Sequence, residues 1–455
     1  MFRLEDPIAA MFTRLGLALL LVFSFARAVS AQPAGFTALF NGRDLAGWRG
    51  GDTYDHRKVL ELPAAERAAL LAKWTTSLTE MKDGRPHWSV DGGELLNDGL
   101  GGFATTERDY GDFELLLEWK ITAGTDSGIY LRGVPQIQIW DPAQPDPNGY
   151  GSARGSGGLW NNDKASAGRD PLVRADRPVG EWNQFRVLMV GSRVSVWLND
   201  QLVVDHAILE NYYDRALPAA QRRPIPPRGP VSLQTHGGET RWRNLFIREI
   251  GPEEANRLLA SRGAAGFQRI FNGRDLDGWT GPIDAVAVAD ETLTWQAGKG
   301  GTLYWNKTLT DFQARLQFKL PPAGNNGLAI RYPGEGDTAY VGMCELQVID
   351  ENYDQLKGPL DPRQVHGSAY GLVGAARGYQ RPTGEWNFQE VTVRGSRLRV
   401  ELNGTVILDA DLATIDPATV MAKRPHPGKD RTSGFFGFAG HNDPVSFREV
   451  FIKSL

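Results

Sequence analysis

Apolar and polar residues alternate along several short stretches of the chain, and each stretch has a counterpart further on. Alternation with a period of two is typical of a strand with one buried face. In the stretch 113–121, for example, Phe, Leu, Trp and Ile alternate with charged residues. The paired stretches are 113–121 with 312–320, 127–132 with 326–331, and 136–141 with 345–350. We therefore predict two copies of one β-rich unit.

A nine-residue sequence opens each copy. Phe40–Trp48 reads FNGRDLAGW, and Phe271–Trp279 reads FNGRDLDGW. A recurrence this close indicates a duplicated domain rather than one large fold. Asn-Gly followed by Arg-Asp is typical of a turn. We expect Trp48 and Trp279 to close the ends of two sandwiches and to touch no substrate.

Turn and helix signals set the predicted domain boundaries. Two-residue hairpin turns are expected at Asn199-Asp200 and Asn403-Gly404. Helix formers follow Pro63 in a stretch without a counterpart, so an inserted helix is predicted there. The fold is predicted to be all-β, with two tandem jelly-roll sandwiches. The expected parts are a signal peptide (1–31), a first sandwich (32–250, helical insertion about 50–86), a linker helix (251–265) and a second sandwich (266–455).

Composition narrows the classes of partner. The chain of 455 residues is 41% hydrophobic, which is enough for two cores. Its net charge of −4 provides no basic field for nucleic acid. An apolar run after Arg14, ending in small residues before Gln32, is typical of a cleaved secretory signal; the alternative is a retained anchor. We expect a periplasmic or secreted protein with no membrane span after cleavage. Cys344 has no partner for an intrachain disulfide and is expected to be buried.

Taken together, the ordered motifs resemble the 3-keto-disaccharide hydrolase domain family, whose members are similar to concanavalin A-like sandwiches. The motifs are the repeated opening, the Gly-Ile-Tyr-Leu-Arg strand, the Gln/Glu-x-Gln-x-x-Asp strand, the Gly-Glu-Trp-Asn hairpin entry and the late histidine. The resemblance implies cleavage of glycosides already oxidised at C3 by a separate dehydrogenase. It implies removal of the C2 proton by a base, β-elimination of the C1 aglycone and hydration. Neither copy has the Glu-x-Asp-x-x-Glu strand of ordinary glucanases on this fold.

The strands and their ends supply the candidates for acid–base chemistry. Each candidate also has a structural interpretation: a turn cap for the aspartates, a solvated edge for the glutamate and a structural group for the histidines. The second copy carries the fuller set, so we predict that it is the more active. The candidate catalytic residues are Glu345, Asp350, His366 and His441 in the second copy, with Asp141 and His236 in the first.

Substrate contacts are predicted on the same strands and beside them. Strand alternation places Arg132 and Arg331 on the face opposite the aliphatic residues, so both are candidates to polarise the ketone, with a structural salt bridge as the alternative. Arg154 or Lys164 is a candidate replacement for His366 in the first copy. Aromatic side chains can stack on sugars, although most aromatics in a sandwich are core. The predicted binding residues are Arg132, Gln136, Gln138, Trp140, Lys164, Arg331, Tyr340 and Gln347, with Tyr130 as a further stacking candidate.

No motif indicates a cofactor. The sequence has no zinc-type spacing, no phosphate-binding glycine loop before a helix and no Gly-x-Ser-x-Gly elbow. A divalent cation on the aspartates has no further support. Two other functions fit the same fold, which does not fix function. They are a non-catalytic, lectin-like carbohydrate-binding protein and a scaffold.

Overall fold

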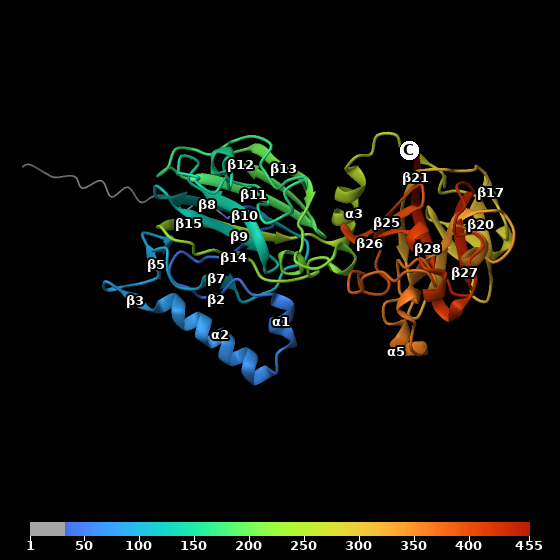
Figure 1. Ribbon diagram of the computed structural model, residues 1–455, viewed down its shortest axis with the longest axis horizontal. Helices are drawn as coiled ribbons and strands as arrows, with labels where there is room; N and C mark the ends of the chain where they lie inside the picture. Colours follow the sequence, from blue (N-terminus) through green and yellow to red (C-terminus); the bar gives the residue numbers. More distant parts are fainter. Residues whose placement is uncertain (1–31) are drawn as a thin grey trace, which may run out of the picture. The chain divides into compact units, whose positions relative to one another are not determined.

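The computed structural model describes residues 32–455, so the predicted signal peptide lies outside the described residues. Two antiparallel β-sandwiches follow one another along the chain, each built from an eight-stranded and a five-stranded sheet (Figure 1). The prediction of two tandem all-β sandwiches is therefore confirmed.

The first sandwich is formed by residues before α3 (Pro252–Ser261). Its larger sheet has the order β13-β12-β11-β8-β15-β6-β5, and β1 also pairs with β15. Its smaller sheet has the order β10-β9-β14-β7-β2. The strands are β1 (Thr37–Ala38), β2 (Trp48–Gly51), β5 (Trp88–Asp91), β6 (Glu94–Asn97), β7 (Phe103–Thr106), β8 (Phe113–Ile121), β9 (Asp126–Leu131), β10 (Val134–Trp140), β11 (Asn183–Val190), β12 (Arg193–Leu198), β13 (Gln201–Ile208), β14 (Ser232–Leu233) and β15 (Thr240–Glu249).

The second sandwich repeats this arrangement. Its larger sheet has the order β18-β19-β28-β21-β24-β25-β26, with β16 pairing β28, and its smaller sheet has the order β17-β20-β27-β22-β23. The strands are β16 (Gln268–Arg269), β17 (Trp279–Thr280), β18 (Val286–Ala289), β19 (Thr292–Trp295), β20 (Gly300–Trp305), β21 (Phe312–Lys319), β22 (Asn325–Tyr332), β23 (Cys344–Ile349), β24 (Asn387–Arg394), β25 (Arg397–Leu402), β26 (Thr405–Asp411), β27 (Phe435–His441) and β28 (Ser446–Ser454).

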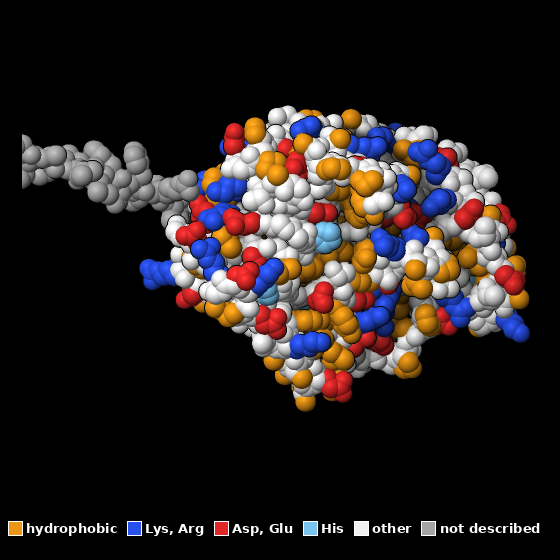
Figure 2. Space-filling model, turned by 60° about the vertical axis from the view of Figure 1, so that its left-hand side comes forward, with side chains coloured by type: hydrophobic (Ala, Val, Ile, Leu, Met, Phe, Trp, Pro, Cys, Tyr) orange, Lys and Arg blue, Asp and Glu red, His pale blue; other side chains and the backbone are white. Residues whose placement is uncertain are grey.

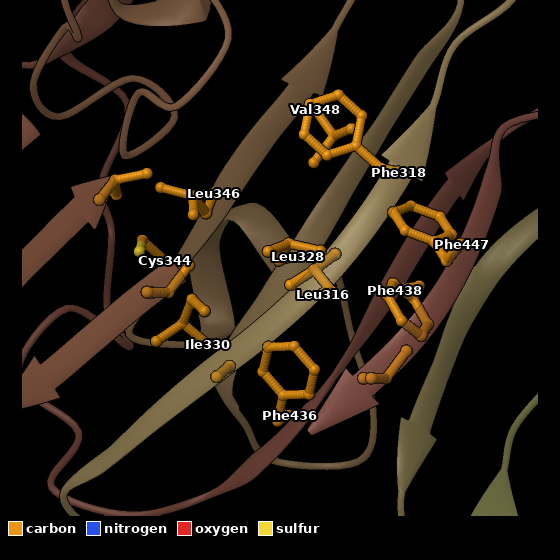
Figure 3. Close-up of a cluster of buried hydrophobic side chains, with 14 of the residues drawn as sticks. Leu316, Phe318, Leu328, Ile330, Cys344, Leu346, Val348, Phe436, Phe438 and Phe447 are labelled. Carbon is orange, nitrogen blue, oxygen red and sulfur yellow. The ribbon is translucent and has the colours of Figure 1, made fainter. Parts of the chain in front are cut away.

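Alternating side chains fill the space between the two sheets of each sandwich. In the second sandwich, Leu328 of β22, Leu346 of β23 and Phe438 of β27 point into the core and face Leu316 and Phe447 of the larger sheet (Figure 3). Cys344 is fully buried in this core, as predicted. Since successive strand residues face opposite sides, the residues between these apolar ones must lie on the outer face of the smaller sheet.

Local turn chemistry follows the sequence closely. Asn199-Asp200 and Asn403-Gly404 form the two-residue turns of their hairpins, with φ values of 49° and 65° and of 49° and 81°. Positive φ at both positions matches the twist of the flanking strands. Trp48 and Trp279 are buried, and their indole Nε1 atoms donate to the carbonyls of Leu39 and Ile270. These predicted structural roles are confirmed.

The insertion in the first sandwich consists of α1 (His56–Glu61), α2 (Ala64–Thr79) and the hairpin of β3 (Met81–Lys82) and β4 (Arg85–Pro86). Helix α2 lies along β2, at the edge of the smaller sheet (Figure 1). The approach is so close that a Cβ on Gly50 would lie 2.0 Å from the carbonyl of Trp74. The insertion therefore covers part of the smaller sheet of the first sandwich. The smaller sheet of the second sandwich has no corresponding helical insertion within residues 32–455.

Three more helices join or flank the strands: α3 (Pro252–Ser261), α4 (Thr338–Val341) and α5 (Tyr353–Lys357). The linker helix α3 buries Ala255 and Leu259 in an apolar cluster with Val190, Ile250 and Phe388. No helix within residues 32–455 is both long enough and apolar enough to cross a membrane. Acidic and basic side chains are interspersed on the face seen in Figure 2, in keeping with the small net charge.

Candidate functional site

A cavity of about 260 Å³ lies on the outer face of the smaller sheet in the second sandwich. Strand β23 contributes one side of it, the ends of β22 and β27 contribute Asn325 and His441, and the remaining residues come from α4, α5 and the loops 358–370 and 421–431. The cavity combines several ionisable groups with three tyrosines, a mixture that suits a polar ligand with flat faces. The lining residues are Asn325, Asp337, Ala339, Tyr340, Glu345, Gln347, Ile349, Tyr353, Leu360, Gln364, Tyr370, Arg424 and His441.

Small residues keep this face of the sheet open. Phe436 and Phe438 of β27 point into the core, so Gly437 and Ala439 between them face outward. In the neighbouring strand β22, Ala329 pairs with both Gly437 and Glu345. These positions carry at most a methyl group, so they leave the space above the sheet to the longer side chains that border the cavity, although they do not line it themselves.

Glu345 and His441 form an acid–base pair at this cavity. The Nε2 atom of His441 lies 2.9 Å from Oε1 of Glu345. The glutamate side chain is only 4% exposed, whereas that of the histidine is 43% exposed. The hydrogen bond to Glu345 raises the pKa of His441, although partial burial opposes the increase. Since Nε2 faces the carboxylate, Nδ1 is the ring nitrogen left to exchange a proton with a ligand.

Gln347 offers a buried hydrogen-bond acceptor beside this pair. Its Nε2 donates to Oδ1 of Asn325 at 2.7 Å. Its Oε1 is buried and has no protein partner, and the side chain lines the cavity. Leaving such an oxygen unpaired costs about 1–3 kcal/mol. A ligand hydroxyl would relieve that cost, so the position fits the predicted role in substrate binding.

Arg424, in the loop 421–431, brings a positive charge to the wall of the cavity that this loop forms with α4. The guanidinium of Arg424 lies 3.6 Å from the centroid of the Tyr340 ring, a cation–π contact. Its ion pair with Asp337 is long, at 3.7 Å. Tyr370 also lines the cavity and accepts a hydrogen bond from Gln364. Tyr340 was predicted, but Arg424, Asp337 and Tyr370 were not. A signal for Arg424 was present, because Arg424-Pro425-His426-Pro427 repeats Arg223-Pro224-Ile225-Pro226 of the first copy.

The equivalent face of the first sandwich carries a different set of charges. Gln136 and Gln138 hydrogen-bond to each other, and Gln138 donates to Asp126 at 2.6 Å. His236 is exposed, and its Nδ1 lies 3.5 Å from Asp126. Burial raises the pKa of Asp126. The carboxylate near this histidine therefore comes from β9, whereas in the second sandwich it comes from β23.

Larger side chains occupy the outer face in the first sandwich. The residues corresponding to Ala329, Gly437 and Ala439 are Tyr130, Ser232 and Gln234. Tyr130 is buried, and its hydroxyl lies 2.9 Å from Oγ1 of Thr53 in the chain leading to the insertion. A cavity of only about 20 Å³ lies here, lined by residues that include Tyr54 and Trp74 of the insertion and Tyr130 and Ser232 of the sheet. The second sandwich thus has the open site.

Arg132 and Arg331 do not reach either outer face, contrary to the prediction. Their φ values of 52° and 49° are left-handed, so each breaks the strand alternation on which the prediction rested. Both side chains are buried. Arg132 donates to the carbonyl of Gly111 and pairs with Asp112, and Arg331 donates to that of Thr310 and pairs with Asp311. The structural salt bridge, given above as the alternative, is what the structure contains.

Asp141 and Asp350 cap turns. Asp141 accepts hydrogen bonds from the backbone amides of Gly124 and Ala143. Asp350 accepts from the amides of Ala323 and Asn352. Both carboxylates are buried, and neither lines the cavity beside Glu345. The structure therefore favours the turn-cap interpretation over a role in acid–base chemistry.

The remaining candidates also lie away from the open site. His366 is buried against Phe318, with Nε2 2.9 Å from Oε1 of Gln389, and burial lowers its pKa to about 4. Trp140 is buried and donates to the carbonyl of Gly155, so its faces are not free for a sugar. Lys164 is exposed on a loop of the first sandwich. Arg154, also exposed, pairs with Asp170. The structure gives none of them a place beside Glu345.

The ionisable groups of the site do not form a metal-ligand cluster. Across residues 32–455, no three or more His, Cys, Asp or Glu side chains gather in a way that could hold a metal ion. The Asp, Glu, His and Arg side chains that line the cavity are Glu345, His441, Asp337 and Arg424.

Comparisons with known proteins agree with the duplication. The 3-keto-alpha-glucoside-1,2-lyase-like domain family matches residues 35–248 and again residues 266–453. A 3-keto-disaccharide hydrolase of Bacteroides thetaiotaomicron is 24% identical over 250 residues, covering 46% of this chain and 86% of the relative.

Two solved structures are also similar. A candidate glycosyl hydrolase from Parabacteroides distasonis has 25% identity and a TM-score of 0.37, covering 42% of this chain and 99% of that one. The carbohydrate-binding module CBM66 from Bacillus subtilis has 16% identity and a TM-score of 0.26, covering 40% and 98%.

Proposed function

Because the chain belongs to the 3-keto-alpha-glucoside-1,2-lyase-like domain family, we propose that the cavity of the second sandwich cleaves glycosides whose sugar carries a ketone at C3. The observation that carries the proposal is the Glu345–His441 pair at the edge of an open cavity. A buried carboxylate that orients a half-exposed imidazole is a common arrangement for a general base.

The proposed reaction begins with proton removal. A ketone at C3 acidifies the hydrogen on C2, and Nδ1 of His441 accepts that proton. Glu345, on the other side of the ring, stabilises the imidazolium that forms. The glycosidic C1–O bond then breaks as the C1=C2 double bond forms, and the departing oxygen takes up the proton from the imidazolium of His441, which restores the neutral base. Addition of water across the double bond places OH on C1 and H on C2, which releases the free 3-keto sugar.

Other side chains of the cavity have supporting roles in this proposal. The unpaired Oε1 of Gln347 accepts a hydrogen bond from a sugar hydroxyl. Arg424 supplies positive charge for the enolate oxygen, since its guanidinium lines the cavity. Preorganised donors and charges of this kind are the usual means of stabilising such an intermediate.

The test is direct. The purified protein is incubated with a 3-keto-glucoside, and release of the free 3-keto sugar is followed by mass spectrometry. We expect turnover by the wild type, a loss of at least about 100-fold in His441→Gln, as is usual for a general base, and full turnover in the matched variant His236→Gln. Inactivity of the folded wild type toward several 3-keto-glycosides would rule the proposal out. Saturable binding of an unoxidised glycan without turnover would instead indicate a lectin-like protein.

Two further parts of the proposal concern the setting of the reaction. The substrate carries a ketone that ordinary glycosides lack, so a glycoside 3-dehydrogenase must act first. We also propose that residues 1–31 direct export to the periplasm or the medium, on the strength of their apolar run and small-residue ending. Cell fractionation of the full-length chain, with N-terminal sequencing of the mature protein, tests this directly.

A further inference from the structure

Glu345 and His441 lie on strands that are not neighbours. In the smaller sheet of the second sandwich, β22 lies between β23, which carries Glu345, and β27, which carries His441. The glutamate side chain must therefore cross the outer face of β22 to reach the imidazole.

Gly327 is the residue of β22 over which Glu345 crosses. A Cβ built on Gly327 would lie 2.1 Å from Oε1 of Glu345, 2.4 Å from its Cγ and 2.5 Å from its Cδ. Each of these distances is far inside van der Waals contact. Any side chain at position 327 would therefore displace the carboxylate from its present position.

The backbone does not by itself require glycine here. Gly327 is not among the glycines with a left-handed φ, so its conformation is open to other residues. Glycine weakens a strand interior, and it often marks a place where another group approaches closely. The space taken by the Glu345 side chain is the close approach that the structure contains.

We infer that Gly327 is a positioning residue: it lets Glu345 cross β22 and hold His441 in its proton-accepting tautomer. The first sandwich provides a natural comparison. Gly128 occupies the matching position, and a Cβ there would lie 2.9 Å from Cδ of Gln136. Gln136, however, hydrogen-bonds to Gln138 on its own strand and not to His236. The glycine is present in both copies, but only the second copy uses it to couple a carboxylate to a histidine.

The test uses Gly327→Ala in the full chain, with Gly128→Ala as the matched control. The ring protons of His441 are titrated by NMR without any substrate, and His441→Gln serves to assign the signal. We expect the pKa of His441 to fall in Gly327→Ala and to stay unchanged in Gly128→Ala. An unchanged His441 pKa in a folded Gly327→Ala protein would overturn the inference.

Activity supplies a second measurement, which rests on the proposed function. In Gly327→Ala we expect kcat on a 3-keto-glucoside to fall at least tenfold, with the acid limb of the pH profile moving to lower pH. A rise in KM alone, with kcat and the pH profile unchanged, would mean that the glycine only makes room for substrate. If no 3-keto-glycoside is turned over, the proposed function fails, whereas the NMR titration still decides the role of Gly327.

A variant without the steric clash protects the test against misfolding. Glu345→Asp keeps the charge but is one methylene shorter, so its carboxylate should not span β22. We expect the same fall in the His441 pKa as in Gly327→Ala. A His441 pKa that stays at the wild-type value in Glu345→Asp would contradict the inference, because reach across β22 would then not matter.

Discussion

Replacing Glu345 by glutamine tests the central pair most sharply. Glutamine has the same shape and can still accept the hydrogen bond from Nε2 of His441, but it carries no charge. The variant therefore removes the electrostatic part of a contact that is 2.9 Å long and leaves its geometry in place. Any change can then be assigned to the lost charge.

The expected magnitude follows from the burial of the two groups. Unit charges about 4 Å apart interact by about 4 kcal/mol near a protein surface and about 1 kcal/mol in water. The Glu345 side chain is 4% exposed and that of His441 is 43% exposed, so solvent screens the pair in part. We take about 2 kcal/mol as the stabilisation of the imidazolium. If the same interaction stabilises the transition state, kcat should fall by a factor of about 30 in Glu345→Gln.

The dependence on pH has a definite sign. Glu345 raises the pKa of His441, and a base works only when it is deprotonated. The wild-type rate should therefore fall on the acidic side around this raised pKa, and in Glu345→Gln the acid limb should move to lower pH. The Glu345–His441 pair should stabilise the folded protein in full below the ordinary histidine pKa, as long as Glu345 is ionised. This stabilisation should be lost as pH rises through the raised pKa of His441. Steady-state kinetics over a pH series on a 3-keto-glucoside, with His236→Gln as control, measure this. A full wild-type kcat and an unmoved acid limb in Glu345→Gln would refute the reasoning.

Three further outcomes are expected. Ala439→Gln, which installs the first copy's Gln234 opposite Gly327 and beside the Glu345–His441 pair, should raise KM at least tenfold with an unchanged near-UV spectrum; unchanged KM would mean that substrate binds elsewhere. Arg331→Leu should lower the free energy of unfolding by about 3 kcal/mol in urea, because buried carbonyls and a carboxylate lose their partner; a loss of activity at full stability would restore a role in catalysis. Burial lowers the pKa of His366 to about 4, so the unfolded chain binds its proton first. The free energy of unfolding should thus fall by up to about 3 kcal/mol between pH 6.5 and 4. Urea denaturation at several pH values measures this, and the free energy should depend less on pH in His366→Phe than in the wild type.

Some residues of the candidate site could be predicted from the strand pattern. Period-two alternation in 345–350 placed Glu345 and Gln347 on one face, and both line the cavity. The repeated late histidine was equally visible, and His441 meets Glu345. Asp337 was not predicted, because the long connection between β22 and β23 has no counterpart in the first copy. Arg424 was missed although Arg424–Pro427 repeats the Arg-Pro-x-Pro of Arg223–Pro226. The repeat marks the position, but only the fold shows that it borders the cavity.

Two kinds of prediction failed or lost support for local reasons. Arg331 was placed on the outer face by counting alternation, but its left-handed φ turns the side chain inward to Asp311. Asp350 matches a strand end in both copies, and its carboxylate accepts hydrogen bonds from the backbone amides of Ala323 and Asn352, in two different connections. A single backbone angle decides the first case, and the paths of the two connections decide the second. Neither is encoded in the residue types alone.

The sequence by itself determined the duplication, the strands, the hairpin turns and the outward-facing polar residues, since all of these depend on neighbours a few positions apart. Only the tertiary structure decided which carboxylate each late histidine meets, because the contact between Glu345 and His441 crosses β22 between strands distant in the chain. It also decided which copy has the larger cavity: about 260 Å³ beside Glu345 and His441 in the second sandwich, against about 20 Å³ where Tyr130 meets the insertion in the first. The two copies have nearly identical strand patterns, but one has an open site and the other a closed face. The difference comes from packing between segments distant in the chain, which the period of the strands does not encode.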